Sequence, residues 1–418
     1  MQIDKLEVEN FRGFNKKEFI LNPSFTVAIG DNGTGKSTLL HAMQVAAGSF
    51  FLGLPNIHRR HIEEDEIRIS FNPDSRQWVY HTPTKIKAIG SINGSGKFSW
   101  QREIPEYGKS TSSKKADVGR IRSIAEEYVK RINTPDRPMM PVIAFFGVRQ
   151  LGGKPKRQKR TKIKRVIVRD GYYNALGSKS DESSYTEWFY YYEENLKKGM
   201  EFEGTFQALI NAIEKAIPFL KNVSFDRFQL QIEADCEIPG QAPKRLLHSL
   251  MSDGLKRMLG IVADIAYRCV VLNGYRGEWA IEETQGIVMI DELDMHLHPN
   301  WQRHVVSDLK RAFPKIQFLA TTHSPFVVQS LKSDELISLD FVVDIAPNEM
   351  KIDEVATDLM GVKSAYSEEN AKKEERAKKI LGLLDTDAHS EEVEREINDI
   401  PDPGLRAFLQ LNKMAKGK

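Results

Sequence analysis

Apolar positions in the first third of the chain follow two different periods, and each period predicts a different kind of element. Residues 5–22 alternate apolar and polar positions around a turn, which is typical of two strands exposed on one face. The apolar run FTVAIG at residues 25–30 indicates a buried strand, and helical spacing in residues 36–48 predicts the helix that follows it. Residues 141–147 form a second buried strand in this interpretation. Together these elements predict one α/β lobe over residues 1–147.

The pattern changes for about a hundred residues and then returns. Residues 148–244 hold a basic loop, the aromatic-rich segment YTEWFYYYEENL and a helix-period segment, so we interpret them as an α-rich insertion. Residues 245–345 contain a long helix and two apolar runs, GIVMIDE and IQFLATTH, joined at helical spacing, which indicates a βαβ unit and a mixed, partly parallel sheet. Residues 346–418 are charged and predict a helical C-terminal tail.

Composition narrows the class of protein without identifying a partner. The 418 residues are 40% apolar, enough for two or three domains with a sizeable core. Sixty basic and 58 acidic residues leave a net charge of +2, yet Arg149–Arg169 contain ten basic residues and no acid. Two cysteines are too few for a disulfide framework, and no apolar run reaches membrane-spanning length. We therefore expect a cytoplasmic protein that makes no membrane contact.

One glycine-rich segment predicts a phosphate-binding loop. Residues 30–37 read GDNGTGKS and fit G-x-x-x-x-G-K-[ST] between a buried strand and a helix. Glycines let the backbone bend round phosphates, while main-chain amides, the helix N-terminus and the lysine bind them, and the serine would hold Mg²⁺. The predicted nucleotide-binding residues are Gly30, Asp31, Asn32, Gly33, Thr34, Gly35, Lys36, Ser37 and Thr38. A turn that binds no ligand is the alternative.

A second segment looks similar but predicts a different structure. Residues 90–99, GSINGSGKFS, contain GSGK but have Phe98 where a phosphate loop needs Ser or Thr. Asn93 and Gly94 lie between two strand-like runs, a pattern that favours a hairpin turn. We therefore expect a single nucleotide-binding loop.

An acid pair ends the apolar run GIVMIDE. The run places Asp291 and Glu292 at the carboxyl end of a parallel strand, where α/β proteins bind ligands. We expect Asp291 to hold Mg²⁺, directly or through water, and Glu292 to polarise the attacking water; two surface acids are the alternative. His296 and His298 follow, but nothing at suitable spacing completes a zinc site, so we interpret them as loop residues.

Two further residues give weaker signals. Ser252 stands where it would cap the long helix, and Gly254 leaves the backbone open, so this helix start could accept a phosphate. Any capped helix has the same pattern. His323 follows the run IQFLATT, where it could contact a γ-phosphate, although a turn histidine satisfied by its neighbours has the same appearance.

In this order the motifs resemble those of an ATP-binding-cassette (ABC) head of the group that contains RecF, Rad50 and the SMC proteins. GDNGTGKS resembles the Walker A motif, SDGLK the signature, IVMIDE the Walker B motif and Leu293-Asp294 the D-loop, while NFRGF resembles the N-terminal hairpin. The resemblance implies a P-loop ATPase that binds ATP and Mg²⁺. The residues it implies are, as catalytic groups, Lys36, Glu292 and His323, and, as further nucleotide contacts, Arg12, Ser252, Gly254 and Asp294.

The sequence departs from the family pattern in two places. Asp253 precedes Gly254 where family signatures often have two adjacent glycines, which puts the strength of the phosphate contact in doubt. Gln150, after the FFGVR strand, is only a candidate for the Q-loop glutamine that would approach the metal.

Motifs beyond the head are similar to the ATPase of the Septu anti-phage system, the PtuA family, which also accompanies some retrons. These motifs are FFGVRQL, RDGYYNAL, YTEWF and EVATDLMGV. The resemblance implies a head-to-tail homodimer or higher homo-oligomer with each ATP between Lys36 of one chain and Ser252 of the other, and an HNH nuclease as partner. The basic residues 154–169 could bind DNA or anchor an acidic partner surface.

The sequence fits several other functions less well. The insertion lacks the heptads of a long SMC-type arm, and the weak Q-loop disfavours a transporter ATPase. A nuclease of the overcoming-lysogenization type would need a metal-binding domain after His323, where only 95 residues remain. The main alternative is a RecF-like DNA-repair ATPase without a nuclease partner, and another is a scaffold that binds ATP and hardly hydrolyses it.

Overall fold

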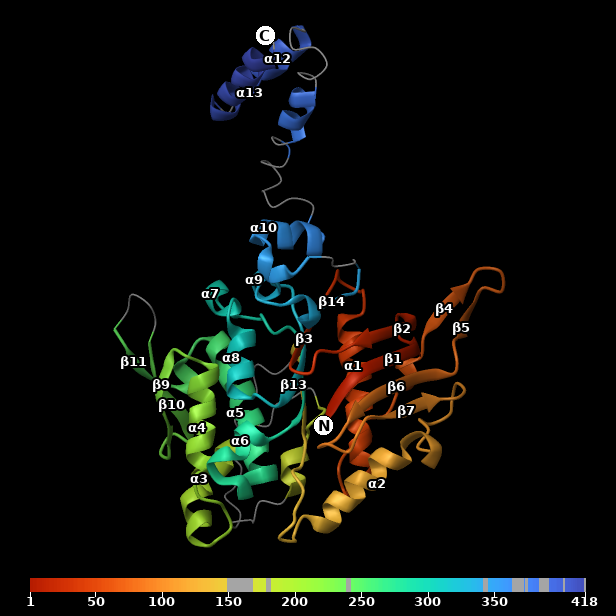
Figure 1. Cartoon of the computed structure of the whole chain (residues 1–418), viewed down its shortest axis with the longest axis vertical. Helices are drawn as coiled ribbons and strands as arrows, with labels where there is room; N and C mark the ends of the chain where they lie inside the picture. Colours follow the sequence, from red (N-terminus) through yellow and green to blue (C-terminus); the bar gives the residue numbers. More distant parts are fainter. Residues whose placement is uncertain are drawn as a thin grey trace. The chain divides into compact units, whose positions relative to one another are not determined.

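Figure 1 shows the computed structural model of the chain, which forms two compact units, Met1–Ile352 and Asp353–Lys418. The residues that the structure describes are 1–148, 168–177, 182–237, 242–340, 345–362, 372, 375–382, 391–400 and 403–416.

A five-stranded parallel sheet forms the centre of the first unit. Its strands lie in the order β14-β3-β13-β12-β8, and every neighbouring pair is parallel. The strands are β3 (Phe25–Ile29), β8 (Val142–Phe146), β12 (Gly286–Ile290), β13 (Ile316–Thr321) and β14 (Leu336–Ser338). The four longer strands are buried along their whole length, as continuous apolar runs require when both faces of a sheet are covered. Because the sheet is parallel, the carboxyl ends of its strands meet at one edge.

A four-stranded antiparallel sheet packs on the other side of helix α1 (Lys36–Ala47). Its order is β2-β1-β6-β7, with β1 (Gln2–Phe11), β2 (Phe14–Ile20), β6 (Thr84–Ser91) and β7 (Phe98–Ile104). Helix α1 contacts β1 and β6 of this sheet and β12 and β13 of the parallel sheet, so it lies between the two (Figure 1). The segment around Asn93 and Gly94 joins β6 to β7 with both residues at positive φ, which confirms the predicted hairpin.

The remaining elements of the first unit surround these sheets. An outlying antiparallel ribbon is made of β4 (Ile69–Asn72) and β5 (Gln77–Tyr80). A three-stranded sheet lies in the order β11-β10-β9, with β9 (Leu220–Asp226), β10 (Gln231–Cys236) and β11 (Lys244–Leu247). The helices are α2 (Lys115–Arg131), α3 (Glu182–Lys197), α4 (Thr205–Ala216), α5 (Asp253–Asn273), α6 (Ala280–Glu283), α7 (Pro299–Gln302), α8 (Val305–Ala312) and α9 (Pro325–Gln329), with α10 (Ile352–Glu354) at the border between the units.

The second unit is helical. It contains α12 (Glu391–Asn398), α13 (Pro403–Lys416) and a helical stretch over residues 375–382. These segments enclose a small apolar core of their own, formed by Ala377, Ile380, Val393, Ile397, Ile400 and Leu409.

The predicted fold class is confirmed: the first unit is an α/β structure of parallel and antiparallel sheets around a P-loop helix, with a helical C-terminal unit. The region predicted as α-rich contains α3 and α4, but it also contains β9 and β10. In the described portion of the chain, no helix combines the length and the apolar character that a membrane crossing requires.

Candidate nucleotide-binding site

The phosphate loop lies between β3 and α1, at the carboxyl edge of the parallel sheet. The ammonium of Lys36 donates to the carbonyl oxygens of Gly30 and Asp31 at 2.7 and 2.9 Å, which curls the loop over its own lysine. Gly35 has a φ of +110°, and a Cβ there would lie 2.5 Å from the Phe14 ring, so only glycine fits. Helix α1 begins directly afterwards, and the amides of its first turn are the donors that an anion would use.

The other residues of the loop differ in exposure. The Thr34 hydroxyl donates to the Asp31 carbonyl at 2.9 Å and closes the turn. Asn32 and Gly33 are exposed at the tip, where Gly33 has a φ of +87°, and Thr38 is buried in the first turn of α1. The tip is therefore open to a ligand while its two ends are fixed.

Asp340 also contacts this loop, although it was not predicted from the sequence as a site residue. It follows the last strand, β14, and its Oδ2 accepts a hydrogen bond from the main-chain N–H of Asp31 at 2.6 Å. Burial lowers the pKa of Lys36, and the carboxylates of Asp340 and Asp31 oppose that effect. Three hundred residues separate Asp340 from the loop, and no motif surrounds it, so only the parallel pairing of β14 with β3 could have revealed it.

Asp291 and Ser37 face each other across the edge of the sheet. The Ser37 hydroxyl lies 3.5 Å from Asp291 Oδ2, and the Thr321 hydroxyl donates to Asp291 Oδ1 at 2.7 Å. The main-chain N–H of Asp291 continues the pairing of β12 with β8 by donating to Phe146 at 2.8 Å. One carboxylate oxygen is thus held by Thr321 and the other faces the phosphate-loop serine.

Glu292 has its main chain held at both ends. Its φ is +51°, its N–H donates to the Thr321 hydroxyl at 2.8 Å, and its carbonyl oxygen accepts from the Arg257 guanidinium at 2.5 Å. The same guanidinium donates to the carbonyl of Asp291 at 2.6 Å. Neither Thr321 nor Arg257 was predicted from the sequence as a site residue, because their contacts with Glu292 depend on how β13 and α5 pack beside it.

Asp294 and His323 lie on neighbouring turns. Asp294 Oδ1 accepts from the Thr322 hydroxyl at 2.6 Å and from the main-chain N–H of His323 at 3.2 Å. The His323 residue itself is exposed. In this single chain, Asp294 therefore fixes the backbone from which His323 projects.

Ser252 caps α5 as its position in the sequence indicates. Its hydroxyl accepts from the N–H of Leu255 at 3.5 Å, and the residue is exposed. Gly254 is buried, and a Cβ there would lie only 2.1 Å from the carbonyl oxygen of His296. The start of α5 therefore packs directly on the turn that follows Glu292.

Arg12 lies in a buried charge cluster beside α1. It donates to Glu66 Oε1 at 2.9 Å, Arg60 pairs with the same oxygen, and Glu66 is fully buried. His41, on α1, is 3.7 Å from that oxygen, and burial together with the charge of Arg12 lowers its pKa to about 4. The carboxylate of Glu66 thus fixes two guanidinium groups next to the helix that carries Lys36.

Several of the predicted residues lie outside this site or outside the described part of the chain. Gln150 and most of the basic stretch 154–169 lie outside the described residues. His298 caps α7 by accepting from the N–H of Asn300 at 3.2 Å. Among the residues with described positions, no group of three or more His, Cys, Asp or Glu side chains could hold a metal ion.

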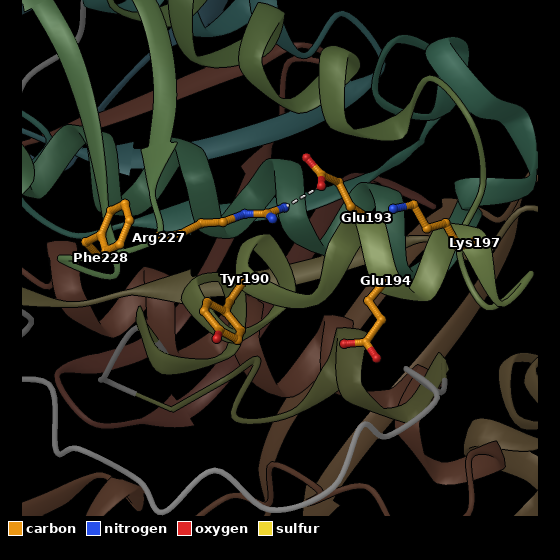
Figure 2. Close-up of a pocket in the computed structure, with 6 residues that line it drawn as sticks. All are labelled: Tyr190, Glu193, Glu194, Lys197, Arg227 and Phe228. Carbon is orange, nitrogen blue, oxygen red and sulfur yellow. Dashed lines mark ion pairs between the residues drawn. The ribbon is translucent and has the colours of Figure 1, made fainter.

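A separate pocket of about 540 Å³ lies in the region predicted as the insertion (Figure 2). It is lined by Tyr190, Glu193, Glu194, Lys197, Arg227 and Phe228. Arg227 is paired with Glu193 at 2.9 Å, and Glu194 is paired with Lys198 at 2.7 Å. None of the lining residues belongs to the site at the sheet edge.

Comparisons with known proteins place the chain in a family. A family model described as an AAA domain matches residues 5–221, slightly more than half of the chain. The chain belongs to this AAA-domain ATPase family. A second AAA-domain model matches residues 178–329, which include the acid pair and His323.

Individual relatives of this AAA-domain chain carry more specific names. "Retron Ec83 probable ATPase" from Escherichia coli is 26% identical over 408 residues, covering 80% of this chain and 71% of the relative. "Septu protein PtuA" from Bacillus mycoides is 39% identical over 131 residues, which is 31% of this chain and 17% of the relative. These relatives confirm the predicted resemblance. Among solved structures, the SMC head domain from Thermotoga maritima gives a TM-score of 0.45 at 14% identity, covering 83% of this chain and 97% of that one.

Proposed function

We propose that the chain is an ABC-type ATPase that hydrolyses ATP between two copies of itself. The observation that carries the proposal is the pairing of Ser37 with Asp291, 3.5 Å apart, with Glu292 next in the chain. This pairing brings together, at one edge of a parallel sheet, a phosphate loop, an acid suited to a metal and an acid suited to activating water.

Ser37 and Asp291 fit a bound Mg²⁺. Both offer hard oxygen atoms, and a site with one carboxylate and one hydroxyl suits an ion that takes its remaining ligands from water and from nucleotide phosphates. The ion, when bound, would withdraw charge from the phosphate oxygens.

The protein's own groups supply the remaining chemistry. Lys36 would exchange its bonds to the loop carbonyls for the β- and γ-phosphates. Glu292 would take a proton from water as the water oxygen attacks the γ-phosphorus, and the bond to the β–γ bridging oxygen would break to give ADP and phosphate. The guanidinium of Arg12 and the imidazole of His323 would also contact the phosphates.

Closure of the site requires a second chain in this proposal. Ser252 is exposed at the start of α5, and no hydrogen bond joins it to the phosphate loop within the described part of one chain. A helix N-terminus with an exposed serine cap suits a γ-phosphate presented by another copy, although Gly254 itself packs on His296 and does not leave the backbone open as the sequence predicted. A head-to-tail dimer would place each ATP between Lys36 of one copy and Ser252 of the other.

The wider role is also a proposal. The Septu and retron names of the relatives support a role in a defence system. We propose, from the resemblance to the Septu ATPase, that ATP binding to the heads restrains or releases an HNH nuclease partner. The basic residues 154–169 are the proposed contact for DNA. Co-purification of a nuclease encoded by the neighbouring gene would support this role. A neighbourhood of recombination genes without a nuclease gene would favour the RecF-like alternative.

The change Glu292→Gln tests the ATPase. We expect the variant to bind ATP, to release phosphate about 10² to 10³ times more slowly, and to accumulate as a nucleotide-bound dimer, because the base is lost while the phosphate loop is intact. Steady-state phosphate release and light scattering with ATP measure both effects. Glu282→Gln is the matched control, since Glu282 precedes β12 at the end of the strand opposite the acid pair and forms an ion pair with Lys215. Full turnover by Glu292→Gln would remove Glu292 as the base.

A further inference from the structure

The backbone at Glu292 takes a conformation that its residue type rarely adopts. Its φ of +51° lies in the left-handed region, where non-glycine residues are uncommon and where Asn, Asp and His are favoured over Glu. Such a conformation persists only when the surrounding structure holds it in place. The groups that hold it are therefore part of how the site works.

Two side chains hold the Glu292 peptide from opposite ends. The Thr321 hydroxyl accepts its N–H at 2.8 Å, and the Arg257 guanidinium donates to its carbonyl oxygen at 2.5 Å. A second nitrogen of the same guanidinium donates to the preceding carbonyl, that of Asp291, at 2.6 Å. The fork of Arg257 thus spans two successive carbonyls, a geometry that the single ammonium of a lysine does not match.

Arg257 is buried where a cation is costly. The residue is only 4% exposed, and its side chain lies on the buried face of α5 together with Met258, Leu259 and Ile261. A buried guanidinium is retained only if its hydrogen bonds compensate for the lost water, and here two of its nitrogens donate to the two carbonyl oxygens of the acid pair. Its place in the fold is thus explained by the main chain of the acid pair.

We propose that Arg257 is a positioning residue that keeps Glu292 in the left-handed conformation and so aims its carboxylate at the attacking water. This inference rests on the proposed role of Glu292 as the base. Arg257 lies on the same helix as Ser252, five residues further along, so the helix that would meet the partner's nucleotide also sets the backbone of the base.

The change Arg257→Met tests this role by removing the fork while keeping an apolar side chain of similar length. We expect kcat for ATP to fall about 10- to 100-fold, because a small misplacement of a reacting group costs this much. The dissociation constant for a non-hydrolysable ATP analogue should stay within about threefold of wild type, since the phosphate loop is untouched. Arg257→Lys, which retains the charge but has a single donor nitrogen instead of the guanidinium fork, should recover part of kcat.

A double variant separates positioning from general damage. If Arg257 acts through Glu292, then Arg257→Met added to Glu292→Gln should slow turnover by less than about twofold further, because the group that Arg257 positions is already absent. A full additional 10-fold loss in the double variant would overturn the proposal. Full turnover by Glu292→Gln alone would instead contradict the proposed base, so the two failures are distinguishable.

Arg268 provides the matched control. It is a second buried arginine of α5, 3% exposed, that also donates to two main-chain carbonyls, those of Gly171 at 2.9 Å and Tyr173 at 3.1 Å. Arg268→Met should lower the thermal midpoint at least as much as Arg257→Met and leave kcat per folded molecule unchanged. Equal losses of kcat in both variants, or unchanged kcat in Arg257→Met and Arg257→Lys, would contradict the proposal. If Arg257→Met does not fold, the kcat of Arg257→Lys decides alone.

Discussion

The Thr321 hydroxyl serves both acids of the site at once. It donates to the carboxylate of Asp291 at 2.7 Å and accepts from the main-chain N–H of Glu292 at 2.8 Å. A hydroxyl can do both because it has one donor and two acceptor positions, and the branched Thr side chain holds that hydroxyl in a restricted rotamer. Thr321 belongs to none of the motifs, yet its hydrogen bonds hold the two acids of the Walker B-like motif in place.

The carboxyl group of Glu201 predicts that the stability of the fold depends on pH. Its Oε1 accepts from the indole N–H of Trp188 at 3.0 Å, and burial raises the pKa of its carboxyl to about 7. Because the pKa of Glu201 is higher in the folded state than in the unfolded state, its protonated form stabilises the fold. This contribution is complete below the unfolded-state pKa, near 4.5, and is lost as the pH rises through about 7. Glu201→Gln keeps the acceptor oxygen and removes the titration.

We therefore expect Glu201→Gln to raise the thermal midpoint at pH 8 by about 1 to 3 °C and to leave it unchanged near pH 4.5. Thermal unfolding followed by circular dichroism across this range measures the difference. The matched control is Glu203→Gln, because Glu203 is exposed two residues away and its replacement should leave the thermal midpoint nearly unchanged. A gain at pH 4.5 as large as that at pH 8 would contradict the explanation.

At the scale of elements, helix α5 links the two halves of the site. It begins at Asp253 with Ser252 as its cap and carries Arg257 on its buried face. Gly254 lets its first turn approach the main chain at His296 so closely that no side chain fits between them. Movement of this helix start would therefore be transmitted to the turn after Glu292 by direct backbone contact.

Gly254 and Gly260 lie on the same helix and predict opposite effects. A Cβ at Gly254 would lie 2.1 Å from the His296 carbonyl oxygen, so Gly254→Ala must displace backbone; we expect a loss of about 2 kcal/mol or more in the free energy of unfolding and a large loss of ATP turnover. At Gly260 nothing lies within 4 Å, so Gly260→Ala should stabilise by up to about 1 kcal/mol. Urea unfolding and phosphate release measure both; a neutral Gly254→Ala would contradict the close approach.

The sequence predicted those elements whose signals are local. The run FTVAIG, the loop GDNGTGKS and the acid pair after GIVMI each carry a strand end and its chemistry within a few residues, and parallel pairing does bring Ser37 to Asp291. Asp340 and Arg257 were not predicted as site residues, because their roles depend on which strand or turn lies beside them. Neither an isolated acid after a short strand nor an arginine in a helix shows its partner in the sequence.

At the scale of the whole molecule, the chain joins an ATPase unit to a small helical unit. All the described residues of the candidate site lie within Met1–Ile352. The unit Asp353–Lys418 has a separate apolar core to which α12 and α13 both contribute. Its stability is therefore set by a few side chains, as expected for a small domain with little buried surface.

Leu409 and Leu411 test this division. Leu409 is 0% exposed in the core of the second unit and Leu411, on the same helix α13, is 67% exposed. Leu409→Ala should cost about 2 to 5 kcal/mol, which for so small a core is enough to unfold the unit, because it leaves a cavity among the residues of α12 and α13. Leu411→Ala should have no measurable effect on unfolding.

Limited proteolysis of the full chain would reveal the outcome, since an unfolded second unit is cleaved while the ATPase unit persists. Affinity for a non-hydrolysable ATP analogue should be the same in both variants, because neither side chain belongs to the nucleotide-binding site. Loss of nucleotide affinity in Leu409→Ala, with Leu411→Ala unaffected, would mean that the helical unit supports the ATPase unit directly, and the division into independently stabilised parts would then be wrong.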